Sequence, residues 1–488
     1  MAGPTHRSLE TIVRRSALLI AMYGVAAVIS LWISRTLPDF DYGLHLRTGQ
    51  WTVEHGWVPD AEVFSAHSST PRWVAYSWAY EVLLYGLDAA LGVWAQIALA
   101  VAMSLAIAHV LFTMVRRISG RTALAAGLSL IGIVAIAPML YGRSMMFTIV
   151  LATLELHLLL RATALDERRA LLFVPLVFAV WANLHVHFLY GLFLYGCFLL
   201  QAWLDALRSA RASRAAVDAW SLATQMTWIG VACVLATLVN PYHVRIYDPI
   251  VRYLFQAPMI YTQLQELKPP SLSSIPSWMT LALIFLVVVG AGRRLLGRPF
   301  LLLMFAIAVA VGLRSARDAW FIVVTGSALL AAALRGPREE RLMAQPLVVA
   351  AGTACAIAVA VSGMGITADS LRAHLRERFP VDATAFIESE NLSWPIYNDY
   401  NWGGYLMWRF PDRKVSIDGR TYVHETGYIL HSLQTWGAEP GWENDPELLT
   451  AGFVLGSQQM PLTASLKRDP RFRLAYEDGT SAVFVRNR

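Results

Sequence analysis

Two carboxylates, a histidine and an arginine lie within nine residues, directly after the first apolar stretch of the chain. This segment reads Asp39-Phe-Asp41-Tyr-Gly-Leu-His45-Leu-Arg47-Thr-Gly49. If a helix begins at Asp41, His45 lies on the same face, because residues four apart are neighbours on a helix. Charged groups gathered next to a membrane-spanning stretch usually mark the path of a substrate. The alternative is a helix N-terminus with solvated charges, since a carboxylate also stabilises that end of a helix.

Two further polar motifs border apolar stretches. The first reads Trp181-Ala-Asn183-Leu-His185-Val-His187. Its two histidines could bind a metal from extended backbone, and the alternative is hydrogen bonding to backbone groups freed at a turn. The second motif is Asn240-Pro241-Tyr242-His243, where Asn240 and His243 either cap a helix or face a cavity.

Long apolar stretches must position these motifs. Hydrophobic residues make up 56% of the chain and charged residues only 15%, which is too little charge for the surface of a soluble protein of this size. A membrane helix needs about 20 mostly apolar residues. On that criterion the sequence predicts eleven spans, near 16–35, 92–114, 122–141, 145–162, 170–184, 188–206, 222–240, 277–292, 299–314, 319–334 and 346–364. A turn around 183–187 must divide the fifth span from the sixth.

Arginine clusters fall on every second connection and predict the orientation. Such clusters mark cytoplasmic loops, so the N-terminus is expected in the cytoplasm and the polar motifs on the outer face. They also account for much of the formal charge of +6, which therefore gives no reason to expect nucleic acid. Abundant alanine and scarce lysine point to a bacterial cytoplasmic (inner) membrane. The clusters are Arg7/Arg14/Arg15, Arg116/Arg117/Arg121, Arg161/Arg168/Arg169, Arg208/Arg211/Arg214, Arg293/Arg294/Arg298 and Arg335/Arg338/Arg341.

Three arginines run against this bias, because Arg143, Arg314 and Arg317 fall on outer connections. A guanidinium group binds phosphate oxygens through two parallel hydrogen bonds, so anion binding is one interpretation. The alternative is an ion pair within the chain, such as Arg317 with Asp318 or Asp41.

Two domains are expected. Residues 1–364 form a transmembrane domain, whose outer loop 36–91 contains interfacial helices because Trp73–Leu87 mixes aromatic residues with an apolar stripe. Residues 365–488 form an extracytoplasmic α/β domain. Its signals are strand-like runs at 415–417 and 482–485, turns at Gly403–Gly404 and Asp418–Gly419, and a helical run near 380–390. The connection 241–276 is expected to be a loop, since prolines interrupt any long helix there.

These features together resemble GT-C type membrane glycosyltransferases. The resemblance rests on many helices, a long first outer loop that begins with a D-x-D-like element at Asp39 and Asp41, and an extracytoplasmic tail. The chain is also similar to a group of poorly characterised bacterial membrane proteins, whose shared elements match Asp39–Gly49, Asn183–His185, Asn240–Tyr242 and Trp402–Arg420. It has no convincing match to the W-W-D-x-G motif of oligosaccharyltransferases.

The resemblance implies a sugar donor linked to a polyprenyl phosphate and an envelope glycan, lipid or protein as acceptor. Asp41 is then the expected general base, with Asp39 as second choice. The expected phosphate and sugar ligands are His45, Arg47, Arg143, Asn183, His185, His187, Asn240, His243, Arg314 and Arg317. A divalent cation, Mg or Mn, is left open, and its candidate ligands are Asp39, Asp41, His185 and His187.

Two other functions stay open. A lipid or sugar transporter should carry charge or broken helices near the middle of the membrane, and the Leu, Ala and Val of the spans lead us to expect no charge there. A non-catalytic assembly or scaffold protein would instead bind an envelope partner through its tail.

Overall fold

The computed structural model describes residues 4–36, 39–68, 72–209, 213–255, 268–337, 339 and 344–487. Its contacts divide the chain into two compact units. Unit 1 comprises Met1–Ser34, Gln96–Ile246 and Tyr261–Gly365. Unit 2 comprises Arg35–Ala95, Tyr247–Ile260 and Ile366–Arg488. The outer loop 36–91, placed with the membrane helices on sequence grounds, is thus grouped with the tail by its contacts.

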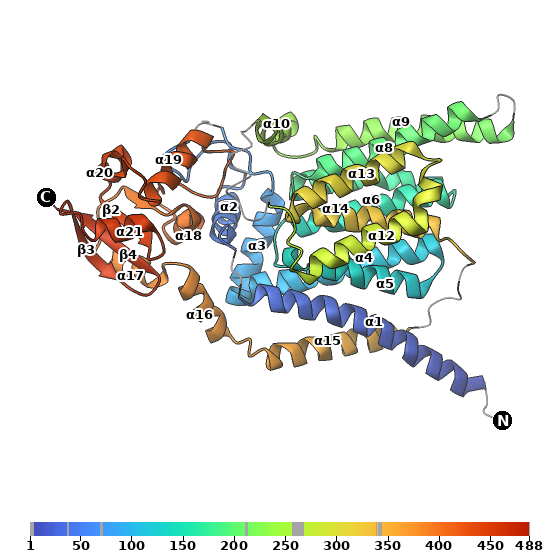
Figure 1. The fold of residues 1–488 in the computed structure, drawn as a ribbon, viewed down its shortest axis with the longest axis horizontal. Helices are drawn as coiled ribbons and strands as arrows, with labels where there is room; N and C mark the ends of the chain where they lie inside the picture. The colour runs from blue at the N-terminus through green and yellow to red at the C-terminus, as the bar shows by residue number, and fades with distance from the viewer. Residues whose placement is uncertain are drawn as a thin grey trace. The chain divides into compact units, whose positions relative to one another are not determined.

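Unit 1 consists of apolar helices that lie side by side (Figure 1). Their bounds are α1 (Pro4–Ser34), α4 (Ala95–Ser119), α5 (Thr122–Ala135), α6 (Met145–Ala164), α7 (Val174–Leu184), α8 (Phe188–Arg208), α9 (Arg214–Ala236), α12 (Ile275–Leu295), α13 (Pro299–Arg314), α14 (Ala319–Ala333) and α15 (Pro346–Gly363). Short 3₁₀ turns join several of them, namely η2 (Ala137–Met139), η3 (Arg168–Phe173), η4 (His243–Tyr247) and η6 (Ala316–Asp318).

The apolar helices make the chain a polytopic membrane protein, as predicted. Within the described residues, eight helical segments are long and apolar enough to cross a membrane. Each of the eleven expected spans coincides with a helix of unit 1, but three of these helices are not among the eight. They are α5, α7 and α13, with 14, 11 and 16 residues. The segment 170–206 is divided where the sequence requires a turn, because α7 ends at Leu184 and α8 begins at Phe188.

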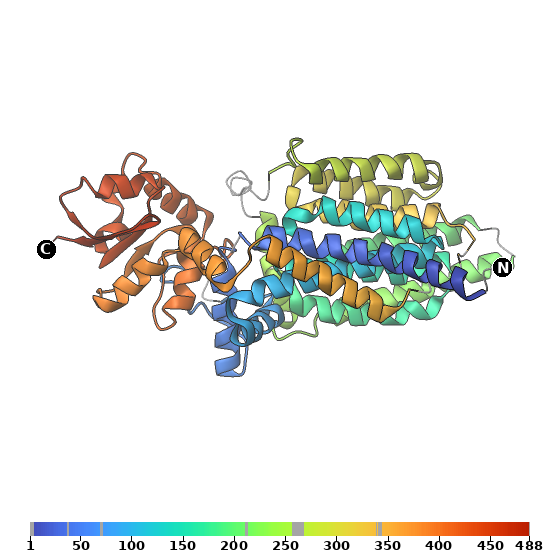
Figure 2. The same ribbon diagram turned by 90° about the horizontal axis from the view of Figure 1, so that it is seen from below.

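Burial distinguishes the helices of unit 1. Fourteen of the 15 residues of α14 are buried, as expected for a helix that is apolar on all sides and surrounded by others. Helix α15 instead buries only Val349 and Thr353, and it packs along α1 (Figure 2). The apolar surface that α15 leaves exposed is suited to lipid.

Unit 2 combines segments from both ends of the chain. From the first outer loop it takes α2 (Tyr42–His55), α3 (Trp78–Leu91) and η1 (Gly92–Trp94). The connection expected to be a loop contributes α10 (Asp248–Phe255), while residues 256–267, which include Pro258, are outside the described part. The tail supplies α16 (Ala368–Arg378), α17 (Val381–Ser389), η7 (Tyr400–Trp402), α18 (Gly403–Arg409), α19 (Thr426–Trp436), η8 (Trp442–Asn444), α20 (Pro446–Thr450) and α21 (Pro461–Leu466).

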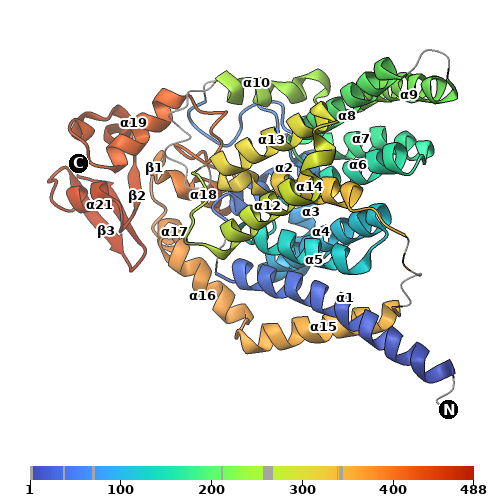
Figure 3. The ribbon, with the colours of Figure 1, turned by 45° about the vertical axis from the view of Figure 1, so that its right-hand side comes forward.

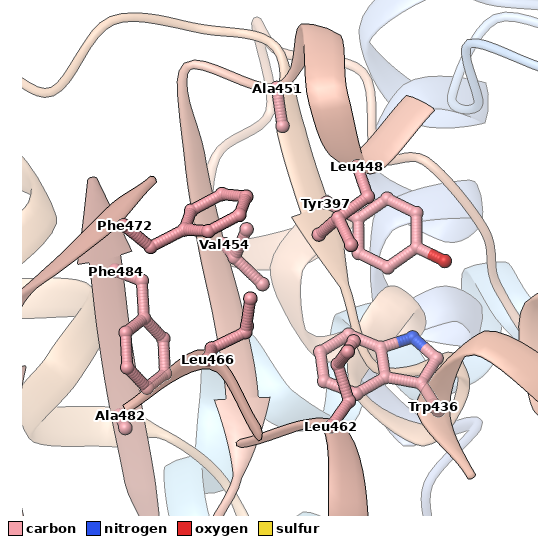
Figure 4. Packing of buried hydrophobic residues seen from close by; sticks show 10 residues of the cluster. All are labelled: Tyr397, Trp436, Leu448, Ala451, Val454, Leu462, Leu466, Phe472, Ala482 and Phe484. Carbon is pink, nitrogen blue, oxygen red and sulfur yellow. The ribbon is translucent and has the colours of Figure 1, made fainter. Parts of the chain in front are cut away.

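A four-stranded sheet confirms the α/β character of the tail. Its strands are β1 (Ile396–Asn398), β2 (Phe453–Ser457), β3 (Phe472–Glu477) and β4 (Ser481–Arg486), in the order β1-β2-β4-β3. β1 is parallel to β2, while the β2–β4 and β4–β3 pairs are antiparallel. Side chains from the sheet and from α19, α20 and α21 form a buried core, which includes Tyr397, Trp436 and Phe484 (Figure 4).

Two local predictions in the tail are wrong. Val415–Ile417 forms no strand, because its only ladder contact is a single bridge between Val415 and Ser65. Gly403 and Gly404 open helix α18 rather than a turn. The lack of a side chain at Gly403 is needed there, since a Cβ atom would lie 2.1 Å from the carbonyl oxygen of Ile417.

Candidate functional site

Helix α2 begins directly after Asp41, which is the condition under which His45 was expected to share a helix face with Asp41. The His45 N–H donates to the Asp41 carbonyl oxygen at 3.0 Å, which closes the first helical turn. Asp41 occupies the N-cap position, but its side chain makes no capping hydrogen bond. The buried Asp39 accepts a hydrogen bond from the Asp41 N–H at 3.1 Å. Asp39 therefore helps to set the backbone of Asp41, whose carboxylate is not used as a helix cap.

The Asp41 carboxylate lies against Gly419 in the tail. A Cβ atom on Gly419 would be 2.5 Å from Asp41 Oδ1. A second close approach lies next to it, because a Cβ atom on Gly43 would be 2.6 Å from the carbonyl oxygen of Gly404. The missing side chains let α2 come close to α18 and to the turn at Gly419.

His45 brings positive charge to this group of acids. Its Nδ1 atom lies 3.0 Å from Glu81 Oε1. Burial lowers the pKa of His45, but the hydrogen bond to Glu81 and the carboxylates of Asp41 and Asp39 raise it by more, so the net pKa is above the ordinary value. We call Asp39, Asp41, His45 and Glu81 the α2 cluster. The three carboxylates favour the protonated form of its one histidine.

Arg47, predicted to bind substrate, has structural contacts. Its guanidinium donates to Glu54 Oε2 at 3.3 Å and to the Pro411 carbonyl oxygen at 3.2 Å. It therefore joins α2 to the tail.

A buried ion network makes a second connection between the loop and the tail. The Arg420 guanidinium donates to Glu62 Oε2 at 2.7 Å and to Asp418 Oδ2 at 2.8 Å. His424 Nε2 lies 3.2 Å from the same Asp418 oxygen, and Arg420 lies 4.7 Å from the centre of the Trp73 ring. Burial alone would raise the pKa of Asp418, but Arg420 and His424 hold it well below its usual range. The D-G-R element read from the sequence as a turn is therefore also the centre of an ion network.

In unit 1, the turn between α7 and α8 gathers a second polar group. His185 Nδ1 lies 2.9 Å from Thr148 Oγ1, and the ring centres of His185 and His187 are 4.4 Å apart. His187 also contacts Tyr190, whose hydroxyl donates to Asp318 Oδ1 at 3.1 Å. We call His185, His187, Tyr190, Arg317 and Asp318 the His187 cluster.

His187 is neutral in this setting. Burial, and then the positive charge of Arg317, lower its pKa to about 3. Its Nδ1 atom is buried and has no hydrogen-bond partner among the described residues. A neutral imidazole has one donor and one acceptor nitrogen, so His187 can hydrogen-bond a ligand but adds no positive charge to the cluster at pH 7.

Three other predicted site residues close the turn after α9. The Asn183 amide donates to the Val239 carbonyl oxygen at 2.7 Å. Asn240 Oδ1 accepts from the Tyr242 N–H at 2.7 Å, and His243 adopts a left-handed backbone with φ 49°. Asn183 and Asn240 thus hydrogen-bond backbone groups at this turn, as the capping and backbone-bonding alternatives describe.

The remaining predicted arginines lie at helix ends of unit 1. The Arg143 guanidinium is 5.0 Å from the centre of the Tyr141 ring, just before α6. Arg314 is the exposed last residue of α13, and Arg317 lies in the short turn η6 that follows.

The candidate metal ligands are divided between the two units. Asp39 and Asp41 belong to unit 2, whereas His185 and His187 belong to unit 1. Over the described ranges, no group of three or more His, Cys, Asp or Glu side chains is arranged to hold a metal ion. The divalent cation therefore stays a prediction, and the proposed reaction does not depend on one.

The expectation of no charge near the middle of the spans is wrong at Glu155. This residue lies half-way along α6, is fully buried, and neither of its carboxylate oxygens has a hydrogen-bond partner in the described part of the chain. It packs beside Trp181 and Gly191, where a Cβ atom on Gly191 would be 2.7 Å from Glu155 Oε2. Figure 3 shows the four helices α6 to α9 of this region. Glu155 could have been found in the sequence as a single acidic residue in a largely apolar stretch.

Comparisons with known proteins bear on the fold. No model of a known protein family matches the chain, and no curated protein matches its sequence. The oligosaccharyltransferase AglB from Archaeoglobus fulgidus, in complex with an inhibitory peptide and a dolichol-phosphate, superposes with a TM-score of 0.55 at 12% identity, over 90% of this chain and 69% of that one. The apo form of the oligosaccharyltransferase from the same organism gives 0.51 at 10% identity over the same shares. ArnT from Cupriavidus metallidurans, bound to undecaprenyl phosphate, gives 0.49 at 13% identity over 99% and 98%. On the likeness to the two oligosaccharyltransferase structures, the chain has the GT-C fold that its sequence predicted.

Proposed function

We propose that this protein transfers a sugar from a polyprenyl-phosphate-linked donor to an envelope acceptor, with Asp41 as the general base. One observation carries the proposal: Asp41 stands at the start of α2 without capping it, beside a histidine whose pKa is raised. Asp39 is the second choice for the base, and its hydrogen bond to the Asp41 backbone favours a supporting role.

The fold supports the proposed class of donor. AglB, which has a similar fold, was solved with a dolichol-phosphate, a long lipid that carries a phosphate. The orientation proposed from the arginine clusters puts the N-terminus in the cytoplasm and the tail outside a bacterial inner membrane. Transfer would then take place on the outer face.

The proposed step is a displacement at the sugar C1 atom. The acceptor hydroxyl oxygen forms a bond to C1, the bond from C1 to the phosphate oxygen breaks, and the hydroxyl proton passes to Asp41. Because a phosphate is already a good leaving group, no strong general acid is required. A positioned base contributes about 10²- to 10⁴-fold to such a reaction.

Positive charge must stabilise the departing lipid phosphate. We propose Arg143, Arg314 and Arg317 for this role, since guanidinium groups match phosphate oxygens. The neutral His187 beside Arg317 would supply a hydrogen bond. Because Arg317 is near enough to affect the pKa of His187, this pair is the strongest candidate for phosphate binding within unit 1.

Glu155 favours one alternative, a transporter. A buried acid inside a membrane helix often marks a path for protons or ions. Glu155→Gln distinguishes the two functions, because it should leave sugar transfer unchanged, whereas it should abolish a proton-coupled transport activity.

The test of the proposed base is sugar transfer by the purified full chain. Asp41→Asn keeps the size of the side chain but removes the proton acceptor, so we expect transfer to fall about 10²- to 10⁴-fold. Asp412→Asn, an exposed acid of the same unit, is the matched control and should retain the wild-type rate. A wild-type rate in folded Asp41→Asn would refute the assignment.

A further inference from the structure

Gly419 is a glycine for reasons of space. Its backbone is not in the left-handed region, so its conformation does not require glycine. A Cβ atom there would approach Asp41 Oδ1 to 2.5 Å, and the next nearest atom is also part of the Asp41 carboxylate group. Among the described residues, the position is thus restricted by Asp41 alone.

The turn that contains Gly419 is rigidly held. The Arg420 N–H donates to Asp418 Oδ1 at 3.0 Å, and the Thr421 N–H donates to the Gly419 carbonyl oxygen at 3.0 Å. The Arg420 side chain adds hydrogen bonds to both Asp418 and Glu62. Asp418, Arg420 and Thr421 are buried, and the Glu62 side chain is only 4% exposed, so the turn has little freedom to move away from Asp41.

The anchor of the turn comes from the same loop as Asp41. Glu62 Oε1 accepts backbone hydrogen bonds from Phe64 and Ser65, both at 2.7 Å. This fixes the carboxylate that receives Arg420. Loop and turn therefore meet at Glu62–Arg420, at Ser65–Arg420 and at Asp41–Gly419.

Helix α18 also lies close to the backbone on both sides of the contact between Asp41 and Gly419. A Cβ atom on Gly404 would lie 3.0 Å from the Phe40 carbonyl oxygen, and one on Gly403 would lie 2.6 Å from the Cα atom of Asp418. The start of α18 thus touches both the residue before Asp41 and the residue before Gly419.

We propose that the tail turn Asp418–Thr421 positions the Asp41 carboxylate for catalysis. Gly419 sets where the carboxylate lies, and Arg420 holds the turn in place. The inference rests on the proposed function, because it assigns a positioning role relative to the base named there. It gives the tail a direct part in the transfer reaction, since a displacement of about 1 Å in a reacting group can cost about 10²-fold in rate.

Gly419→Ala tests this directly in the purified full chain. The new methyl group meets only the end of the Asp41 side chain, which can rotate away, so the protein should fold and keep its Tm. We expect kcat to fall about 10- to 100-fold with an unchanged KM for the donor. Gly427→Ala is the matched control, since Gly427 lies in α19 with no atom within 4 Å of a Cβ, and it should keep the wild-type kcat.

A double variant separates positioning from other effects. If Gly419 acts through Asp41, then Gly419→Ala in the Asp41→Asn background should cause no further loss. Additive losses, or a wild-type kcat in Gly419→Ala while Asp41→Asn is impaired, would overturn the positioning role and leave the proposed base intact. A wild-type rate in Asp41→Asn would remove both.

A second variant tests the proposal independently, should Gly419→Ala fail to fold. Arg420→Lys keeps the charge but loses the planar group that contacts Glu62 and Asp418 together. A lowered kcat at an unchanged donor KM supports the proposal, and a wild-type kcat in a folded Arg420→Lys protein contradicts it.

Discussion

The carboxylates Asp39, Asp41 and Glu155 differ in what surrounds them. Asp39 accepts a backbone N–H and holds a turn. Asp41 lies beside the raised-pKa His45 and against Gly419. Glu155 is enclosed by apolar helices, and none of the described groups hydrogen-bonds to it. The neighbours of each carboxylate therefore decide its role. Asp39 stabilises local structure, Asp41 is proposed for catalysis, and Glu155 reduces stability.

Replacing Glu155 should stabilise the protein. A buried acid without a partner costs free energy whether it is charged or has taken up a proton. We expect Glu155→Met to raise the free energy of unfolding by about 1–3 kcal/mol, measured as a higher Tm in detergent. The exposed Glu390 provides the control, since Glu390→Gln should change stability by less than about 0.5 kcal/mol. A lower Tm in Glu155→Met would show that the carboxyl group has a stabilising partner.

For single residues, the sequence predicted the contacts between positions that are close together in the chain. The i, i+4 relation of Asp41 and His45 follows from local spacing once a helix begins at Asp41. The role of Gly419 could not be read in the same way, because its contact with Asp41 joins positions far apart in the chain. Glu155 was visible in the sequence, but its missing partners become apparent only once the neighbouring helices are in place.

At the scale of elements, the Glu62–Arg420–Asp418 network joins the outer loop to the tail. Asp418 has a folded-state pKa well below the ordinary value of 3.8. Its contribution to stability is therefore present above about pH 4, the unfolded value, and is lost as the pH falls from there through the folded value. Unit 2 should accordingly lose stability in strong acid.

Removing the cation should reverse this dependence on pH. Arg420→Met leaves two buried carboxylates without their partner, which costs about 3–5 kcal/mol at pH 7. Without the cation, burial raises the pKa of Asp418, so the variant should gain stability as the pH falls from 7 towards 5. The measurement is Tm against pH, with exposed Arg473→Gln as a control that should follow the wild type. An Arg420→Met curve parallel to the wild type would contradict a stabilising network.

The elements themselves were largely predictable. Hydropathy located the apolar helices, and the tail signals located α17 and β4. The failures at Val415–Ile417 and Gly403–Gly404 have a common cause, because both segments are shaped by contacts with other segments. Val415 pairs with Ser65 from the outer loop, and Gly403 lies against Ile417.

At the scale of the whole molecule, unit 2 is built from segments separated by most of the membrane helices. Hydropathy could not reveal this assembly, since it describes each stretch by itself. The loop and the tail share the contacts of Gly43 with Gly404, Arg47 with Pro411 and Glu62 with Arg420. The loop should therefore depend on the tail for its own stability.

A chain that ends at Gly365 tests this dependence. Without the tail, α2 loses the partners of Gly43 and Arg47, so its amide hydrogens should exchange at least about tenfold faster than in the full chain. Hydrogen exchange followed by mass spectrometry measures this, and the buried helix α14 of unit 1 should keep its protection. Unchanged exchange in α2 would mean that the loop folds independently of the tail.

The central claim is sugar transfer from a lipid-linked donor. The most direct measurement is to incubate the purified full chain with a panel of radiolabelled polyprenyl-phosphate sugars and envelope extract as the source of acceptors. We predict that one donor yields a labelled acceptor together with free polyprenyl phosphate, and that Asp41→Asn loses both products. A folded protein that releases no polyprenyl phosphate from any donor, and labels no acceptor, would contradict the claim.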